Sequence, residues 1–280
     1  MERLATKLDP GSKAKLNNGV EMPLLGLGVY QSPAGRITQD AVKFALKIGY
    51  RHIDTARIYN NEADVGKAVR ESGVPRGEVF ITTKLWNSDQ GYESALQAFE
   101  SSLRRLGLNY LDLYLIHFPV PGVRNESWKA MKALLKQGKC KAVGVSNFTI
   151  PHLEELLKTT DTIPAVNQVE FNPFLYQKEL LNYCHEKRIQ LEAYSPLTRG
   201  EKLAHPKNKA LAAKYSKTPA QILMRWSLQH GLVVIPKSVR EERIRENSQV
   251  FDFNLTDQDI GVLDSLNENM RVNWDPTNIP

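Results

Sequence analysis

The sequence predicts an α/β protein of the (β/α)8 barrel class. Short runs rich in β-branched residues alternate with longer amphipathic segments along the 280 residues, and polar residues stand where most of these runs end. Strands that alternate with helices build parallel sheets, and eight such units close into a barrel. No linker or shift in composition divides the chain, so we expect a single domain over residues 1–280.

Eight short apolar runs are the predicted strands, since their length and β-branched content favour extended backbone. They cover residues 24–27, 52–54, 79–84, 111–116, 141–145, 165–170, 190–193 and 233–236. The segments between them have helical periodicity, with glycines such as Gly107 as end signals. The clearest predicted helices cover residues 39–47, 92–106, 126–137, 150–158, 178–187 and 219–229.

A hairpin is predicted before the first strand. Asn18 and Gly19 form the Asn-Gly pair typical of a type I′ turn, and short extended segments flank it. We expect this hairpin to plug the bottom of the barrel.

Composition argues against several function classes. No apolar run approaches the ~18 residues of a membrane span, and the N-terminal segment lacks a signal-peptide apolar region, so we expect a cytoplasmic protein without a membrane partner. Cys140 and Cys184 are too few for a disulfide framework, and neither has metal-ligand spacing, so no metal site is expected. The net charge of +6 comes from cations scattered among acids, which favours a small anionic ligand over nucleic acid.

Polar residues at the strand ends are the candidate functional groups, because the active site of such a barrel lies at the C-terminal ends of its strands. Taken singly, Asp54 could be a helix cap, Lys84 a side chain reaching water, and His117 a core histidine. Their convergence on one rim favours a catalytic site instead. The residues at the predicted strand ends are Asp54, Lys84, His117, Ser146, Asn147, Gln168, Tyr194 and Ser195.

Seven stretches carry a family resemblance: "GYRHIDTARIYNNEADVG", "FITTKLW", "LDLYLIHFP", "GVSNF", "NQVEFNP", "YSPL" and "IPKSVREERIRENSQVFDF". In this order and spacing the chain resembles the aldo-keto reductase family over nearly its whole length, and in particular its short-tailed microbial and protozoan members. The resemblance implies a monomeric, NADPH-dependent carbonyl reductase acting on small aldehydes and ketones. Its catalytic tetrad would be Asp54, Tyr59, Lys84 and His117.

The chemistry of carbonyl reduction agrees with these four residue types. Hydride delivery to a carbonyl carbon builds negative charge on the oxygen, so a proton donor is needed there. Tyr59 can donate, and the Lys84 ammonium is expected to lower its pKa from about 10, with Asp54 keeping the lysine charged. A neutral His117 could hydrogen-bond the substrate oxygen and orient it.

The cofactor site is expected after the last strand. "GLGVYQ" fails the dinucleotide fingerprint at its last position, and no P-loop is present. Barrels can bind phosphate at the loops after strands seven and eight, and residues 235–247 follow the last strand and start a helix. Without the resemblance, a solvated helix held by its own ion pairs explains these charges as well.

The resemblance assigns the cofactor contacts residue by residue. The adenosine 2′-phosphate would contact Lys237, Ser238, Arg240 and Arg243, with Val239 in the same cofactor-binding segment, and the adenine would contact Glu246 and Asn247. The nicotinamide carboxamide would contact Ser146, Asn147 and Gln168, Tyr194 would stack on the ring, and Ser195 and Leu197 would line the pyrophosphate path. Thr198-Arg199 and Asn172 depart from the residues common in relatives, so no contact is assigned to them.

The substrate pocket is expected to have apolar walls from Tyr30, Trp86 and Phe118 beside His117, with Trp274 as a last wall. Small or aromatic aldehydes fit such a pocket best. A barrel that binds the cofactor as a regulatory subunit, as some relatives do for potassium channels, would carry the same tetrad, but usually with an added N-terminal arm that this sequence lacks. A nucleic-acid-binding barrel is the less favoured alternative.

Overall fold

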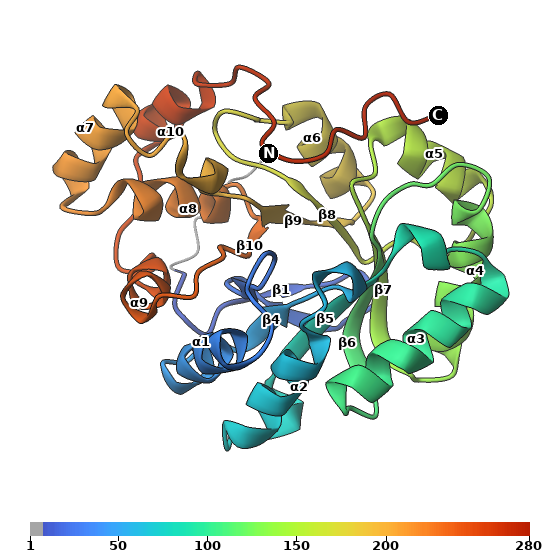
Figure 1. The fold of residues 1–280 in the computed structure, drawn as a ribbon. Helices are drawn as coiled ribbons and strands as arrows, with labels where there is room; N and C mark the ends of the chain where they lie inside the picture. The colour runs from blue at the N-terminus through green and yellow to red at the C-terminus, as the bar shows by residue number, and fades with distance from the viewer. Residues whose placement is uncertain (1–7) are drawn as a thin grey trace.

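The structure, a computed structural model, describes residues 8–280 and has the predicted parallel barrel (Figure 1). Eight parallel strands follow one another in the order β3 to β10. Isolated parallel bridges join Leu25 to Val234 and Gly28 to Lys237, so the first and last strands meet and the sheet closes. The strands are β3 (Leu27–Gly28), β4 (His52–Asp54), β5 (Phe80–Leu85), β6 (Leu111–Ile116), β7 (Cys140–Ser146), β8 (Val166–Glu170), β9 (Gln190–Tyr194) and β10 (Val233–Val234).

Helices surround the strands (Figure 1). In α3, the buried Ala95, Phe99, Leu103 and Leu106 recur at helical spacing, so one apolar face packs inward. The same helix ends at Gly107, whose φ of 63° is the left-handed conformation of a C-terminal cap. The helices are α1 (Arg36–Lys47), α2 (Glu62–Glu71), α3 (Tyr92–Leu106), α4 (Arg124–Lys136), α5 (Ile150–Lys158), α6 (Lys178–Glu186), α7 (Pro206–Tyr215), α8 (Pro219–Gln229), α9 (Glu241–Ser248) and α10 (Asp257–Asp264).

Some predicted elements differ from the structure. The first predicted strand, residues 24–27, is observed as Leu27–Gly28, and the last, residues 233–236, as Val233–Val234, with Leu25 and Lys237 joined to the barrel through isolated bridges. Helix α7 was not predicted, and it buries only Asn208, Leu211 and Ala212, too few to produce a clear periodic stripe.

The N-terminal hairpin of β1 (Lys13–Lys15) and β2 (Glu21–Pro23) lies at the bottom of the barrel, as predicted. The Nδ2 atoms of Asn17 and Asn18 donate to the backbone oxygens of Pro164 (3.0 Å) and Lys141 (2.9 Å), close to the starts of β8 and β7. The predicted type I′ turn is wrong. Gly19 has a φ of 87° but Asn18 is not left-handed, and the Leu16 N–H donates to the Val20 oxygen at 2.8 Å across a three-residue loop.

Among residues 8–280, no helix combines the length and the apolar character that crossing a membrane requires.

Candidate active site

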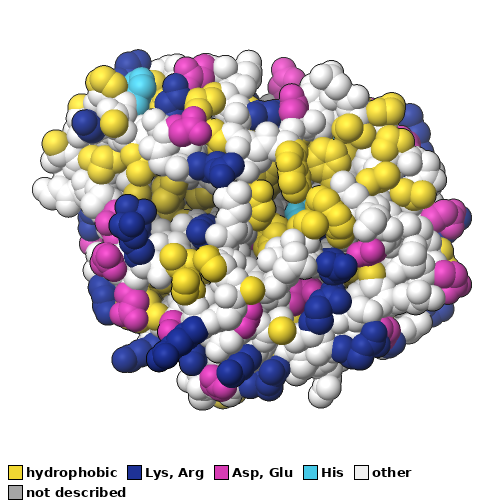
Figure 2. All heavy atoms as spheres, viewed as in Figure 1, with side chains coloured by type: hydrophobic (Ala, Val, Ile, Leu, Met, Phe, Trp, Pro, Cys, Tyr) yellow, Lys and Arg dark blue, Asp and Glu magenta, His cyan; other side chains and the backbone are white. Residues whose placement is uncertain are grey.

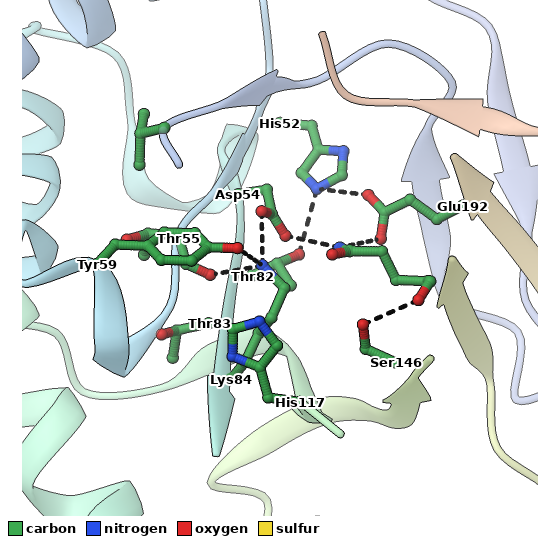
Figure 3. A network of polar contacts seen from close by, with 12 residues as sticks. His52, Asp54, Thr55, Tyr59, Thr82, Thr83, Lys84, His117, Ser146 and Glu192 are labelled. Atoms are coloured by element: carbon green, nitrogen blue, oxygen red, sulfur yellow. Dashed lines mark hydrogen bonds and ion pairs between the residues drawn. The ribbon is translucent and has the colours of Figure 1, made fainter. Parts of the chain in front are cut away.

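The structure brings the four predicted catalytic residues together at the carboxyl ends of the strands (Figure 3). Asp54 ends β4, Lys84 lies in β5, and His117 directly follows β6. Tyr59 ends the short 3-10 helix η1 (Arg57–Tyr59), which carries the chain out of the barrel after β4. The turn after β4 therefore places the phenol of Tyr59 at the barrel mouth, close to Asp54 at the end of the same strand.

Lys84 is wholly buried, and its ammonium group has three hydrogen-bond acceptors. Its Nζ donates to Asp54 Oδ1 at 2.6 Å, to the backbone oxygen of Thr55 at 2.9 Å and to the Tyr59 hydroxyl at 3.4 Å. A buried ammonium is stable only with such a partner, so Asp54 holds the lysine in place. Burial raises the pKa of Asp54, while Lys84 and Gln168 oppose that rise.

The phenol of Tyr59 is a firmly protonated donor. Desolvation raises its pKa well above 10, and the negative charge of Asp54 adds to the effect, as do Tyr30 and Glu192. The prediction that Lys84 brings this pKa below 10 is wrong. The reason is that burial of the phenol outweighs the nearby ammonium, which Asp54 already pairs with at 2.6 Å.

His117 is uncharged, because burial and then the positive charge of Lys84 lower its pKa well below 6.5. Its ring packs edge-on against Trp86, with centroids 5.3 Å apart, and against Tyr59, with centroids 5.8 Å apart. Nδ1 of the same ring is buried without a hydrogen-bond partner among the described residues. The imidazole is thus held by packing at the mouth as a neutral group.

A cavity of about 1180 Å³ runs from this cluster toward α9. Figure 2 shows hydrophobic side chains gathered around a hollow near the centre of this face. Asp54, Tyr59 and His117 open into the cavity, whereas Lys84 lies beneath them. Every residue predicted to bind the cofactor lines it: Ser146, Asn147, Gln168, Tyr194, Ser195, Leu197, Lys237, Ser238, Val239, Arg240, Arg243, Glu246 and Asn247.

The residues predicted to contact the nicotinamide are linked to one another. Asn147 has a left-handed φ of 64° and donates through Nδ2 to the backbone oxygen of His117 at 2.9 Å. The Tyr194 hydroxyl donates to Asn147 Oδ1 at 2.7 Å, and the Ser146 hydroxyl donates to the backbone oxygen of Gln168 at 2.8 Å. The ends of β7, β8 and β9 are therefore fixed relative to His117.

The far end of the cavity carries uncompensated positive charge. Lys237, Arg240 and Arg243 all line it, and none forms an ion pair with a carboxylate of the described residues. Burial and then the nearby Arg199 lower the pKa of Lys237. The alternative of a helix held by its own ion pairs does not describe this segment, where Glu246 instead accepts from the Thr218 hydroxyl at 2.7 Å.

Sequence reasoning left out Arg199, although this residue also lines the cavity. Arg199 adopts a left-handed φ of 53°, and its Nη2 donates to Gln31 Oε1 at 2.9 Å. The two residues lie 168 positions apart, and no local pattern signals the contact. Asn172, the other unassigned position, caps a turn by accepting from the N–H groups of Phe174 and Leu175.

The predicted substrate walls also meet at the mouth. Trp274 lies 5.6 Å from Trp86 and 6.5 Å from Phe118 between ring centroids, and the Tyr30 and Tyr59 rings are 5.0 Å apart.

The C-terminal segment that carries Trp274 is anchored by a residue that sequence reasoning missed. Glu170, at the end of β8, accepts from the N–H groups of Val272 at 2.8 Å and Asn273 at 3.1 Å.

The sequence model of the aldo/keto reductase family matches residues 25–268. The chain belongs to the aldo/keto reductase family. The aldo/keto reductase described here is 54% identical over 262 residues to a glyoxal reductase of Bacillus subtilis, covering 94% of this chain and 95% of that one. It is 50% identical over 266 residues to a 9,11-endoperoxide prostaglandin H2 reductase of Trypanosoma cruzi, covering 94% of each chain.

The same barrel is found in solved structures. A Bombyx mori aldo-keto reductase in complex with NADP superposes with a TM-score of 0.89 at 36% identity, covering 95% of this chain and 96% of that one. The (β/α)8 barrel predicted from the sequence is therefore confirmed, and the chain is an oxidoreductase of this family.

Proposed function

We propose that this aldo/keto reductase reduces aldehydes and ketones to alcohols with NADPH. The observation that carries the proposal is one continuous cavity, with a proton donor and a neutral histidine at one end and three cations without carboxylate partners at the other. The NADP complex of the Bombyx mori relative and the reductase names of the other relatives support it.

The residues of the cavity fit such a cofactor. Lys237, Arg240 and Arg243 would meet the 2′-phosphate, since Arg forms paired charge-assisted hydrogen bonds with phosphate oxygens. Tyr194 would stack on the nicotinamide, and the reduced ring, when bound, supplies the hydride. The carboxamide would be held by Ser146, Asn147 and Gln168, the pyrophosphate by Ser195 and Leu197, and the adenine by Glu246 and Asn247. Ser238 would join the contacts to the 2′-phosphate, and Val239 lies in the same cavity-lining segment.

The chain's own residues provide the acid chemistry. The neutral His117 would donate from Nε2 to the substrate oxygen and so orient the carbonyl above the cavity floor. Tyr59 would pass its phenolic proton to that oxygen as negative charge develops there. The high pKa of Tyr59 is no obstacle, because the alkoxide that forms is a much stronger base than a phenolate. Lys84, held by Asp54, would stabilise the phenolate left behind.

The aromatic walls favour small or aromatic aldehydes. The rings of Tyr30, Trp86, Phe118 and Trp274 lie around the mouth, where an apolar or aromatic substrate group would pack against them. We also propose that the protein is cytoplasmic, because both cysteines are buried free thiols, and that it acts as a monomer, as the family resemblance implies.

The test is to mix the protein with NADPH, add a panel of aldehydes including glyoxal and benzaldehyde, and follow the absorbance of the reduced nicotinamide. We expect turnover on several of them. Tight NADPH binding without turnover on any aldehyde would contradict the proposal and favour a regulatory, cofactor-binding barrel.

A further inference from the structure

A second buried polar cluster lies behind Asp54, on the side away from Tyr59, and the mechanism above does not use it (Figure 3). Its centre is Glu192 of β9, which is wholly buried. Glu192 stands opposite Gln168 of β8 in the parallel register, and His52 approaches from β4. The cluster therefore reaches the catalytic tetrad through a single side chain, Gln168.

Gln168 is held by two carboxyl groups at once. Its amide nitrogen donates to Asp54 Oδ2 at 2.8 Å and to Glu192 Oε2 at 2.8 Å, which uses both of its hydrogens. The amide oxygen of Gln168 is the atom left for the cavity, which this residue also lines. The hydrogen bonds to Asp54 and Glu192 thus orient the Gln168 amide, so that its oxygen would face a bound nicotinamide.

No cation of the described residues forms a direct ion pair with Glu192. The Lys84 ammonium already pairs with Asp54 at 2.6 Å. His52 Nε2 lies 3.6 Å from Glu192 Oε1, but burial and then the charge of Lys84 lower the pKa of His52 to about 3, so this ring is neutral. Its Nε2 faces the Thr82 hydroxyl at 3.2 Å instead.

Glu192 therefore differs from Asp54 in having no ammonium group within ion-pair distance. Burial and then repulsion from Asp54 raise the pKa of Glu192 to about 8, against the opposing effects of Gln168 and Lys84. The groups that face it are His52 and Asp54 from β4, Lys84 from β5 and Gln168 from β8. Ionisation of Glu192 would place a negative charge beside Asp54 and close to Tyr59.

We propose that Glu192 is a positioning residue for the reaction, whose buried carboxyl holds Gln168 toward the cofactor from the side opposite Asp54. This inference rests on the proposed carbonyl reduction. When Glu192 ionises, its charge opposes the negative charge that Tyr59 acquires on giving up its proton, and the reaction slows. Glu192 would contact neither the substrate nor the reacting atoms. It would act indirectly, through its hydrogen bond to Gln168 and through its electrostatic effect on Tyr59.

The first experiment compares pH profiles of kcat/KM for aldehyde reduction. In the unmodified protein, log kcat/KM should fall above about pH 8 toward a slope of −1, because only the protonated form is fully active. Glu192→Gln should match the unmodified protein below pH ~7 and lack this fall, since the amide stays neutral and can accept from Gln168. An unchanged fall in Glu192→Gln would overturn the proposal.

Two further variants separate positioning from a structural effect. Glu62→Gln is a matched control, because Glu62 is also buried but accepts from Thr83 and Arg105, each at 2.6 Å, outside the cluster. It should keep the fall near pH 8. Glu192→Met removes the acceptor for Gln168 and should lower kcat about tenfold at every pH. Equal activity of Glu192→Met and Glu192→Gln would show that the hydrogen bond to Gln168 has no role.

The second experiment needs neither cofactor nor activity. The carboxyl carbons of glutamate are labelled with ¹³C, and their NMR shifts are followed against pH in the cofactor-free protein. One resonance should titrate near pH 8 in the unmodified protein and in Glu62→Gln, and should be missing in Glu192→Gln. Titration of that resonance in the ordinary glutamate range would overturn the inference whatever the activity, whereas an inactive protein with the expected titration would contradict only the proposed reduction.

Discussion

At the inner end of the cavity, the Lys84 ammonium lies 2.6 Å from Asp54, while burial lowers the pKa of His117 well below 6.5 and raises that of Glu192. At the outer end, Lys237, Arg240 and Arg243 face the same cavity with no carboxylate partner among the described residues. Charge at the inner end is balanced within the protein, so burial and neighbouring charges set the free energy of proton transfer there. Charge at the outer end has no such partner, and this is why we propose that it binds the cofactor phosphate.

The largest expected effect comes from removing the proton donor at the inner end. Tyr59→Phe should lower kcat for reduction by about 10² to 10⁴, the usual contribution of a general acid, with NADPH affinity nearly unchanged. The control is Tyr30→Phe, whose ring lies 5.0 Å from that of Tyr59. Stopped-flow turnover and a fluorescence titration of NADPH measure both effects, and wild-type turnover in Tyr59→Phe would show that another group is the acid.

The next effect concerns the buried ion pair. Lys84→Met leaves Asp54 buried and unpaired, so it should reduce turnover severely and lower the free energy of unfolding by about 3–5 kcal/mol. Adding Asp54→Asn removes the stranded charge. The double variant should therefore recover much of the stability but none of the activity.

Urea denaturation and turnover of the two variants separate these effects. Activity that returned together with stability in the double variant would mean that Lys84 supports the fold and has no part in the proton transfer.

At the outer end we expect a smaller and cofactor-specific effect. A hydrogen bond between charged groups contributes about 1.5–3 kcal/mol, so Arg243→Ala should weaken NADPH binding about ten- to a hundredfold and hardly affect NADH. Arg245 of the same helix is a matched control, because its guanidinium lies over the Phe44 ring, 5.2 Å from the centroid, and does not line the cavity.

Both cofactors can be titrated against Arg243→Ala and Arg245→Ala by quenching of tryptophan fluorescence. An equal loss for NADH and NADPH in Arg243→Ala would mean that Arg243 supports the helix and leaves the phosphate to other residues.

The comparison also separates what sequence could predict from what it could not. Strand ends of a parallel barrel meet on one rim, so Asp54, Lys84 and His117 could be placed together from their positions alone. The protonation states of the site residues could not be predicted in this way. The pKa of Tyr59 depends first on how deeply the phenol is buried and then on the charge of Asp54, and the sequence shows neither. Glu192, in the middle of a strand, had no signal at all until its register opposite Gln168 was known.

The smallest expected effect lies at the mouth, where the substrate meets Trp274. This ring is 48% exposed and lies 5.6 Å from Trp86, so it covers only one side of a bound ring. Aromatic pairs contribute about 0.5–1.5 kcal/mol beyond buried area, so Trp274→Ala should raise KM for benzaldehyde about two- to tenfold. Trp274→Phe should restore most of the affinity. Since glyoxal has no ring to stack, its KM should stay nearly constant across the series, and steady-state kinetics on both substrates provides the check. An equal rise for glyoxal and benzaldehyde would show that Trp274 closes the mouth against water and does not recognise the substrate ring.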